Sequence, residues 1–239
     1  MRRVLVTGGA GFIGSHFIRI LLAEEADAQV VNLDVLTYAG NLANLADVAS
    51  SPRYRFVRGD IRDMKVAQEL AADADWIVNF AAESHVDRST KARAGEFIDT
   101  NVYGAYVMLE ATRQVNRGAR FLQVGTDEVY GDVPFPEFPN EQAMLAPSSP
   151  YSAAKAGADH IALAFHRTHQ MDVIVSRCTN NYGPNQYPEK VIPVFVTNAL
   201  DGEPLPLYDG GTQVRDWLRV EDHCRALLLL LRRGVAGEI

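Results

Sequence analysis

The sequence has few of the features that would place it in a membrane, a secretory pathway or a metal-binding class. Its longest apolar run is Ala226 to Leu231, whereas a membrane-spanning helix needs ~20 apolar residues. The opening "MRRVLVTGG" holds a three-residue apolar run, too short for the core of a signal peptide. Two cysteines, Cys178 and Cys224, lie far apart in no metal-ligand spacing. We expect them to be reduced core residues, in a cytoplasmic protein without a membrane span or a bound metal.

Basic residues are also in the minority. The 239 residues include 23 Lys and Arg against 30 Asp and Glu, which gives a net charge of −7. This acidic balance argues against non-specific binding to nucleic acid or to an anionic membrane surface. With 47% hydrophobic and 22% charged residues, the chain has the composition of an ordinary globular protein that buries its own core.

Short apolar runs alternate with longer amphipathic segments along most of the chain. The runs predict strands over 3–8, 28–34, 54–60, 75–82, 119–126 and 171–178. The amphipathic segments predict helices over 12–25, 64–72, 95–115 and 149–169. This alternation indicates an α/β fold with a doubly wound parallel sheet, covered by helices on both faces.

The pattern changes after Cys178. Residues 180–193 are rich in Asn, Pro and Gly and indicate an ordered loop. A helix over 192–201, a strand over 205–211 and a helix over 221–233 are expected next. Because the residues end at "GVAGEI", where a further strand is expected to begin, we expect this smaller C-terminal portion to be incomplete.

Residues 7–14, "TGGAGFIG", combine a strand end, a glycine-rich turn and the start of a helix. Two glycine patterns overlap here in the context that a dinucleotide-binding fingerprint requires: Gly9, Gly11 and Gly14 fit G-x-G-x-x-G, and Gly8, Gly11 and Gly14 fit G-x-x-G-x-x-G. The glycines let the backbone approach a pyrophosphate, and the N–H groups of Phe12 and Ile13 offer that anion the positive end of a helix. Residues 1–178 are therefore predicted to form a Rossmann-type domain.

An acidic residue at the end of the second strand predicts the cofactor. There the Asp34 carboxylate would accept hydrogen bonds from ribose hydroxyls and would repel a 2′-phosphate, so we expect NAD rather than NADP. Asp60 and Ile61, at the end of the third strand, are expected to contact the adenine. A plain strand-end turn explains that second pair equally simply.

Tyr151 and Lys155 lie four residues apart at the start of a predicted helix and so share one face. An ammonium about 4 Å from a tyrosine contributes on the order of 4 kcal/mol at an effective dielectric of 20. Such an interaction lowers the tyrosine pKa from about 10 by up to about three units. Tyr151 is therefore predicted to take a proton from a substrate hydroxyl while hydride leaves the same carbon. Lys155 is predicted to lower the pKa of Tyr151 and to hold the nicotinamide ribose.

Two adjacent carboxylates, Asp127 and Glu128, follow a predicted buried strand in the stretch "GTDEVYGD". In a dry cleft such a pair tends to divide into one neutral acid and one ionised base. Neighbouring side chains of a regular strand point to opposite faces, however. The pair can therefore serve one substrate only if the backbone turns where the strand ends.

These features together resemble the extended short-chain dehydrogenase/reductase superfamily, whose members act on nucleotide-activated sugars. Five stretches narrow the resemblance, over essentially the whole chain, to the dTDP-glucose 4,6-dehydratase family: residues 34–42, 81–89, 125–132, 180–193 and 215–223. Related sugar epimerases and decarboxylases share the glycines and the Tyr–Lys pair. They do not usually have Asp-Glu directly after the threonine.

The resemblance implies an NAD-dependent hydro-lyase that converts dTDP-glucose to dTDP-4-keto-6-deoxyglucose. Tyr151 would deprotonate the C4 hydroxyl while hydride leaves C4, and Thr126 would hydrogen-bond the C4 oxygen. Glu128 would then remove the C5 proton. Protonated Asp127 would give its proton to the C6 hydroxyl, which leaves as water before hydride returns to C6.

The resemblance also implies a wider set of contacts. Further cofactor contacts would come from Leu36, Thr37, Ala81, Ala82, Ser84, Thr100 and Asn181. Substrate contacts would come from His85, Asn180, Lys190, Val191, Pro206, Leu207, Tyr208 and, at the diphosphate, Arg215. Residues 179–239 would begin a nucleotide-sugar-binding portion, of which about 212–235 would pack back on the first domain. The helix over 95–115 would join a four-helix bundle in a homodimer.

Two alternatives remain beside this interpretation. One is another nucleotide-sugar enzyme of the superfamily, an epimerase or a decarboxylase, which Asp127 and Glu128 disfavour. The other is a non-catalytic NAD-binding protein, which applies if the chain truly ends at Ile239 and leaves the sugar pocket incomplete. The sequence does not distinguish a thymidine from a uridine nucleotide, nor the pathway served.

Overall fold

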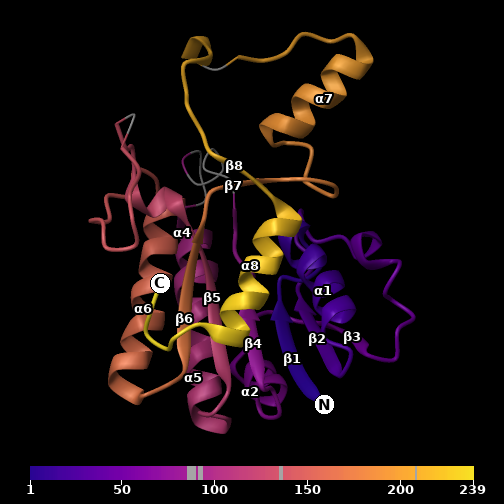
Figure 1. Cartoon of the computed structure of the whole chain (residues 1–239), viewed down its shortest axis with the longest axis vertical. Helices are drawn as coiled ribbons and strands as arrows, with labels where there is room; N and C mark the ends of the chain where they lie inside the picture. The colour runs from indigo at the N-terminus through magenta and orange to yellow at the C-terminus, as the bar shows by residue number, and fades with distance from the viewer. Residues whose placement is uncertain (85–89, 91–93, 135–136, 208) are drawn as a thin grey trace.

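The computed structural model describes residues 1–84, 90, 94–134, 137–207 and 209–239 (Figure 1). The main sheet has the strand order β3-β2-β1-β4-β5-β6 in this part of the chain. Its strands are β1 (Arg2–Thr7), β2 (Ala28–Asp34), β3 (Tyr54–Arg58), β4 (Trp76–Asn79), β5 (Arg120–Thr126) and β6 (Val173–Cys178). All neighbouring strands are parallel, as the alternating pattern predicted. The chain reverses its direction of travel across the sheet between β1 and β4, which is where ligand clefts form in such sheets.

Helices cover both faces of this sheet (Figure 1). The longer ones are α1 (Phe12–Glu24), α2 (Met64–Ala71), α5 (Ala105–Val115), α6 (Pro150–His169), α7 (Val191–Asp201) and α8 (Val220–Arg233). The shorter helical segments are η1 (Leu42–Leu45), α4 (Ala94–Phe97), η2 (Ile98–Gly104), η3 (Asp127–Tyr130) and η4 (Asp209–Gly211). None of the helices in the described ranges is long and apolar enough to cross a membrane.

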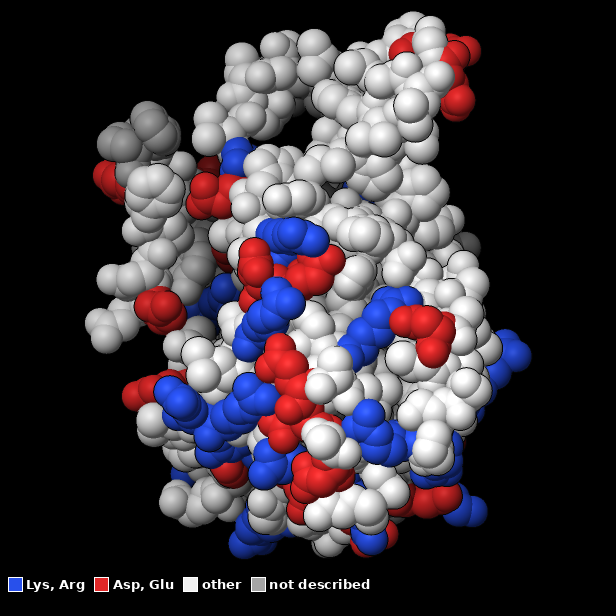
Figure 2. All heavy atoms as spheres, turned by 45° about the vertical axis from the view of Figure 1, so that its right-hand side comes forward, with Lys and Arg blue, Asp and Glu red and all other residues white. Residues whose placement is uncertain are grey.

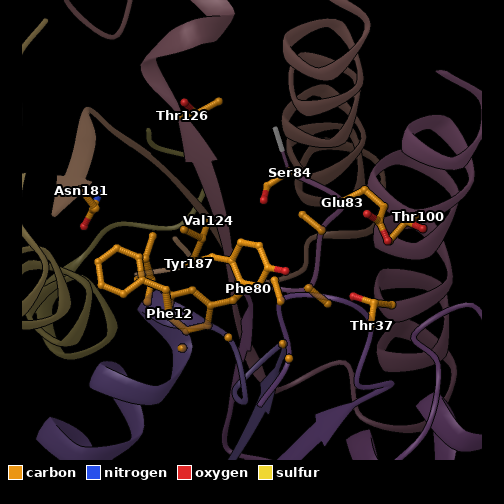
Figure 3. Close-up of a pocket in the computed structure, with 18 of the residues that line it drawn as sticks. Phe12, Thr37, Phe80, Glu83, Ser84, Thr100, Val124, Thr126, Asn181 and Tyr187 are labelled. Carbon is orange, nitrogen blue, oxygen red and sulfur yellow. The ribbon is translucent and has the colours of Figure 1, made fainter. Parts of the chain in front are cut away.

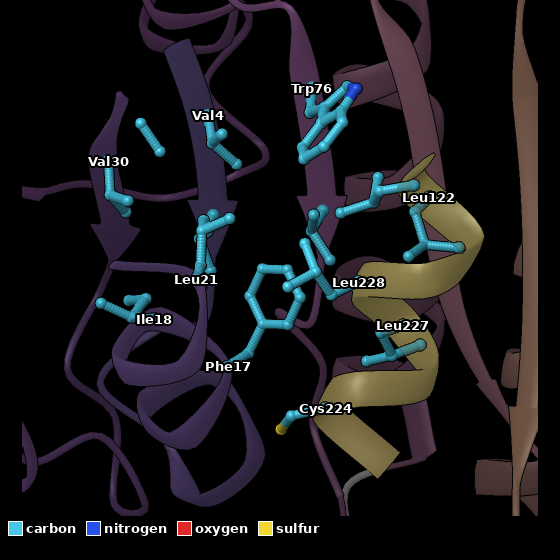
Figure 4. Packing of buried hydrophobic residues seen from close by; sticks show 14 of the residues in the cluster. Val4, Phe17, Ile18, Leu21, Val30, Trp76, Leu122, Cys224, Leu227 and Leu228 are labelled. Carbon is cyan, nitrogen blue, oxygen red and sulfur yellow. The ribbon is translucent and has the colours of Figure 1, made fainter. Parts of the chain in front are cut away.

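One hydrophobic core lies between the sheet and the helices α1 and α8 (Figure 4). Phe17 and Leu21 of α1 meet Leu227 and Leu228 of α8 over the apolar side chains of β1, β4 and β5. All four of these side chains are almost completely buried. Because each such side chain contributes roughly 1.5–3 kcal/mol when it leaves water, this contact fixes the last helix of the chain on the first.

A second core lies on the opposite face, under α2, α5 and α6. Its centre includes Val107 and Met108 of α5, Phe121 of β5 and Val173 of β6, each fully buried. The helix predicted over 95–115 runs without a gap through α4, η2 and α5, and its middle section over η2 is π-helical. Within η2 the Asn101 side chain bonds the backbone N–H and C=O of residue 83 at 2.8 and 3.0 Å.

Residues 183–216 form a long excursion from the α/β body, which includes α7 and η4 (Figure 1). The excursion begins and ends at a small parallel sheet of β7 (Asn180–Tyr182) and β8 (Trp217–Arg219). The strand predicted over 205–211 is wrong: its described residues are exposed and form no ladder, because no strand in that part of the fold lies beside them. Figure 2 shows charges of both signs interspersed over the body and few on the projecting excursion.

Candidate active site

A cleft of about 410 Å³ opens at the carboxyl ends of the strands, between the glycine-rich turn, β4, β5 and the start of the excursion. Figure 3 shows Thr126 at the end of β5, Asn181 on β7 and Phe12 at the start of α1 among the residues that line it. The cleft is lined by most residues that we predicted: Gly8, Gly11, Phe12, Ile13, Gly14, Asp34, Thr37, Asp60, Ile61, Ala81, Ala82, Ser84, Thr100, Thr126, Glu128, Tyr151, Lys155, Asn180, Asn181, Lys190 and Val191.

A smaller group of predicted site residues lies elsewhere. Leu36, Asp127, Pro206, Leu207 and Arg215 are not among the residues that line the cleft. His85 and Tyr208 lie outside the described residues, so their predicted contacts stay predictions. Pro206 and Leu207 belong to the exposed excursion, which rises away from the cleft after α7.

The glycine-rich turn is too tight for side chains. Gly8 has φ +69°, and a Cβ placed there would come within 2.7 Å of the backbone nitrogen of Ala81. A Cβ on Gly14 would come within 2.5 Å of the Gly8 carbonyl oxygen, so α1 can approach the turn only through glycine. The first turn of α1 has no side-chain cap and no acidic residue. Its N–H groups are therefore available to an anion.

Asp34 ends β2 beside this turn and is held by backbone groups on both sides. Its carboxylate accepts the N–H of Ala10 at 2.9 Å and the N–H of Leu36 at 2.8 Å. Burial raises the pKa of Asp34, and these two bonds act in the opposite direction. Leu36, which we predicted as a cofactor contact, has φ +59° and holds the Asp34 carboxylate in place through its backbone N–H.

Tyr151 and Lys155 enter the cleft from the first turns of α6. Ser149 caps this helix by accepting the N–H of Ser152 at 3.1 Å, and Pro150 occupies its first position, so both residues lie at fixed places in the helix. Lys155 is buried and donates its Nζ to the Val124 carbonyl at 2.6 Å.

The prediction that Lys155 lowers the pKa of Tyr151 is wrong for this arrangement. Burial raises the pKa of Tyr151, and the nearby groups Glu128, Cys178 and Asp127 raise it further, while a hydrogen bond with Thr126 lowers it. Burial also lowers the pKa of Lys155, which Asp159 opposes. Desolvation, which favours the neutral form of each group, is therefore the largest influence on both pKa values.

The backbone turns directly after β5, which is the condition that two adjacent acids need to serve one substrate. Residues 127–130, hereafter the acidic turn, form the helical turn η3, and Thr126 caps it by accepting the N–H of Glu128 at 3.3 Å. Gly131 ends it at φ +73°, where a Cβ would come within 2.1 Å of the Ala146 carbonyl. Glu128 consequently lines the cleft. The adjacent Asp127 accepts a hydrogen bond at its Oδ1 from Thr126 Oγ1 at 3.3 Å.

The two acids of this turn have shifted pKa values. Burial raises the pKa of Asp127, and burial together with the neighbouring Asp127 raises the pKa of Glu128. The exposed Arg215 acts on both carboxyls in the opposite direction. Raised and mutually coupled pKa values suit a pair in which one carboxyl stays protonated while the other ionises.

Several residues of the cleft were missed from the sequence. Tyr38 and Tyr187 meet edge to face across it, with ring centroids 5.3 Å apart, although 149 positions separate them in the chain. Glu189 lines the cleft as well, and its buried Oε1 has no hydrogen-bond partner among the described residues. The position of Glu189 directly before Lys190 was the one available signal, whereas nothing in the sequence pairs two distant tyrosines.

Comparison with known proteins places the chain in a family. The model of a family described as GDP-mannose 4,6 dehydratase matches residues 5–239. A dTDP-glucose 4,6-dehydratase of Streptomyces niveus is 53% identical over 99% of this chain and 71% of its own length. A crystal structure of dTDP-glucose 4,6-dehydratase from Streptomyces venezuelae with NAD bound is 54% identical, with a TM-score of 0.95 over 99% of this chain and 74% of that chain. A UDP-glucuronic acid 4-epimerase from Bacillus cereus is 27% identical, with a TM-score of 0.92 over 99% of this chain and 76% of that chain. The chain belongs to the dTDP-glucose 4,6-dehydratase family.

Proposed function

We propose that the protein binds NAD in the cleft and converts dTDP-glucose to dTDP-4-keto-6-deoxyglucose by loss of water. The observation on which this rests is the acidic turn, which places Glu128 in the same cleft as Tyr151 and adds Asp127 to the groups that act on that tyrosine. A Tyr–Lys pair alone supports hydride transfer. An acid and a base beside it support elimination as well.

The residues of the cleft fit NAD. The side-chain-free turn at Gly8 and Gly14 leaves room for a pyrophosphate against the N-terminus of α1, and the fixed Asp34 carboxylate suits ribose hydroxyls. Asp60 and Ile61, which also line the cleft, would hold the adenine, and Lys155 would hold the second ribose. The chemistry that NAD supplies is reversible hydride transfer, away from C4 of the glucose and back to C6.

The side chains of the site divide the proton transfers among themselves. Tyr151 accepts the proton of the C4 hydroxyl as hydride leaves C4, and Thr126 bonds the C4 oxygen. The resulting ketone acidifies the C5 proton, which Glu128 removes and gives back to C5 when hydride returns to C6. The C6–O bond breaks as protonated Asp127 gives its proton to that hydroxyl, so that one water leaves. The raised pKa of Asp127 favours its protonated form for this step.

We further propose that the protein works as a cytoplasmic homodimer. Two free thiols accord with a reducing compartment. The helical layer η2 and α5 exposes Ile98, Tyr103 and Tyr106, with 55%, 51% and 39% of each residue accessible. A row of exposed apolar and aromatic side chains on neighbouring turns fits a self-complementary contact between two copies.

Isotope transfer tests the reaction. The protein is incubated with dTDP-glucose that has deuterium at C4, and the product is analysed by NMR. We expect a 4-keto product in which the deuterium has moved to C6. A product that is inverted at C4 and keeps its C6 hydroxyl would identify a 4-epimerase and contradict the dehydration.

A further inference from the structure

A buried ion pair lies behind the catalytic face of α6. Tyr151, Lys155 and Asp159 are spaced four residues apart and so follow one face of this helix. The first two line the cleft, whereas Asp159 is completely buried behind them. Its Oδ2 accepts Arg177 Nε at 2.9 Å, and the exposed fractions of the two side chains are 5% for the arginine and 0% for the aspartate.

The same arginine reaches the acidic turn from behind. Arg177 belongs to β6 and lies opposite Gly125 of β5 in the parallel ladder. Its Nη1 donates to the Tyr130 hydroxyl at 2.9 Å. Tyr130 is itself buried and is the last residue of the acidic turn. A continuous chain of contacts therefore links the helix of Lys155 to the turn that presents Glu128.

The packing around this pair leaves it little freedom. A Cβ on Gly125 would come within 2.9 Å of Asp159 Oδ1 and 2.5 Å of the Ser176 carbonyl, so the carboxylate lies against the backbone that leads to Thr126. That Oδ1 accepts no hydrogen bond from the described residues, although Lys155 acts on it electrostatically. A buried ion pair is weak evidence for stability, because desolvating its charges offsets most of their attraction. The pair lies between α6, which carries Tyr151 and Lys155, and the acidic turn, which carries Glu128. This position points to a role in the site.

We propose that Asp159 and Arg177 form a positioning pair for this site. Asp159 balances the buried positive charge of Lys155. Arg177 holds Tyr130 and with it the acidic turn. The catalytic consequence rests on the proposed function, whereas the balance of charge at Lys155 is a property of the protein alone.

The charged groups around Lys155 set the direction of the expected effect. Asp159 acts on it from the same helix and Cys178 from β6, and both raise its pKa against the effect of burial. Arg177 and His160 act on Asp159 in turn. Removing the Asp159 charge should therefore lower the pKa of Lys155, which would lose its proton at a lower pH than in the parent protein.

NMR titration of the lysines tests the first half of the proposal. The chain has four lysines, Lys65, Lys91, Lys155 and Lys190, so protein with ¹³C-labelled lysine gives a spectrum that one substitution, Lys155→Met, assigns. In Asp159→Asn we expect the pKa of Lys155 to fall by about one unit or more. An unchanged Lys155 pKa in a folded variant would overturn the charge-balancing role.

A second, more exposed Arg–Asp pair on the same two strands provides the control. Arg120 of β5 pairs with Asp172, just before β6, at 2.9 Å, at the opposite ends of the same two strands. Asp172→Asn should leave the pKa of Lys155 unchanged. A fall as large as that in Asp159→Asn would mean that any broken pair loosens the site, and would overturn the proposal. Should Asp159→Asn fail to fold, Asp159→Glu retains the charge on a longer stem, and the Lys155 pKa must then stay within the parent range.

Tyr130→Phe tests the second half, because it removes a hydroxyl and keeps the ring. We expect kcat for dehydration to fall about tenfold or more with KM unchanged, since a small displacement of catalytic groups has effects of this order. Hydride removal in the first turnover, followed by nicotinamide absorbance, should keep its rate. Tyr54→Phe is the control, because the Tyr54 hydroxyl bonds Asn32 away from the acidic turn. Equal kcat in both variants would overturn the positioning role.

Absence of turnover in the parent protein would instead refute the proposed function, and the lysine titration would still decide the charge balance.

Discussion

The side chain of Glu128 lines the cleft, and burial raises its pKa. The substitution of its carboxylate by an amide tests its role as the base at C5. Glu128→Gln keeps the shape and loses the basicity. We expect deuterium uptake from solvent at C5, measured by NMR, to fall by roughly a hundredfold or more. Bound NAD, measured by absorbance after gel filtration, should stay at the parent amount.

The exposed residue Glu69 on α2 offers the control for this change. Glu69→Gln removes the same charge outside the cleft and should leave both measurements unaffected. Continued C5 exchange in Glu128→Gln would show that another group is the base. Glu189, whose buried Oε1 has no hydrogen-bond partner in the described part of the chain, would then be the next candidate.

His223 gives the folded protein a predictable dependence on pH. It is 3% exposed, its Nδ1 lies 2.9 Å from Asn181 Oδ1, and burial lowers its pKa from 6.5 to about 4. His223 is therefore protonated below pH 6.5 in the unfolded chain, but only below about pH 4 in the folded chain. The stability that the neutral imidazole contributes is present above pH 6.5 and is lost as pH falls through this window.

We expect this group to remove about 2 kcal/mol of stability between pH 7 and pH 5. Urea unfolding at the two pH values measures it in the parent protein and in His223→Gln, which cannot titrate there. Subtracting the two pH dependences cancels the other titrating groups. The same loss in both proteins would assign the pH dependence to residues other than His223.

At the scale of elements, α8 is the helix that holds the end of the chain on the body. Leu228 is fully buried against α1 and the sheet, while the adjacent Leu229 is 49% exposed. We expect Leu228→Ala to lower the free energy of unfolding by about 3 kcal/mol, since it removes buried methyl groups and leaves a cavity. Leu229→Ala should change it by less than about 0.5 kcal/mol. Urea denaturation measures both, and equal losses would contradict this packing of α8.

The elements also show how far the sequence predicts the fold. The parallel sheet and its covering helices were predictable because strand and helix periods differ and the runs are long. β7 and β8 were not, because three paired residues have no detectable period. The π-helical form of η2 was not predicted, and the contact of its Asn101 with residue 83 is made only in the folded chain. The strand expected over 205–211 fails because Pro206, Gly210 and Gly211 disfavour a strand and no strand lies beside its described residues.

The site also has features that the sequence predicts and features that it does not. Glycines, Asp34, Tyr151 and Lys155 are recognisable because each has a chemical reason for its spacing in the chain. The pKa of Tyr151 was predicted in the wrong direction, since burial cannot be read from a pair of residues on one helix. Arg177 and Asp159 come together only through the β5–β6 ladder, so neither residue by itself indicates the other.

At the scale of the whole molecule, the exposed face of η2 and α5 predicts the assembly. Ile98→Glu places a charge on this apolar face, and we expect it to weaken a homodimer by about 2 kcal/mol or more. Sedimentation velocity across a range of concentrations measures the dissociation. Leu200→Glu, on α7, adds the same charge at an 82% exposed position outside this face and should leave the dimer intact. A parent protein that stays monomeric at every concentration would refute the dimer.

The small β7–β8 sheet has a consequence for how this protein can change over generations. Parallel neighbours lie about 4.8 Å apart, so residues 183–216 leave the body and rejoin it at almost the same point. Insertions, deletions and substitutions within that span need not disturb the register at either anchor. Natural variation can therefore remodel the part of this segment beyond Val191, while its first residues, among them Tyr187 and Lys190, are held as part of the cleft.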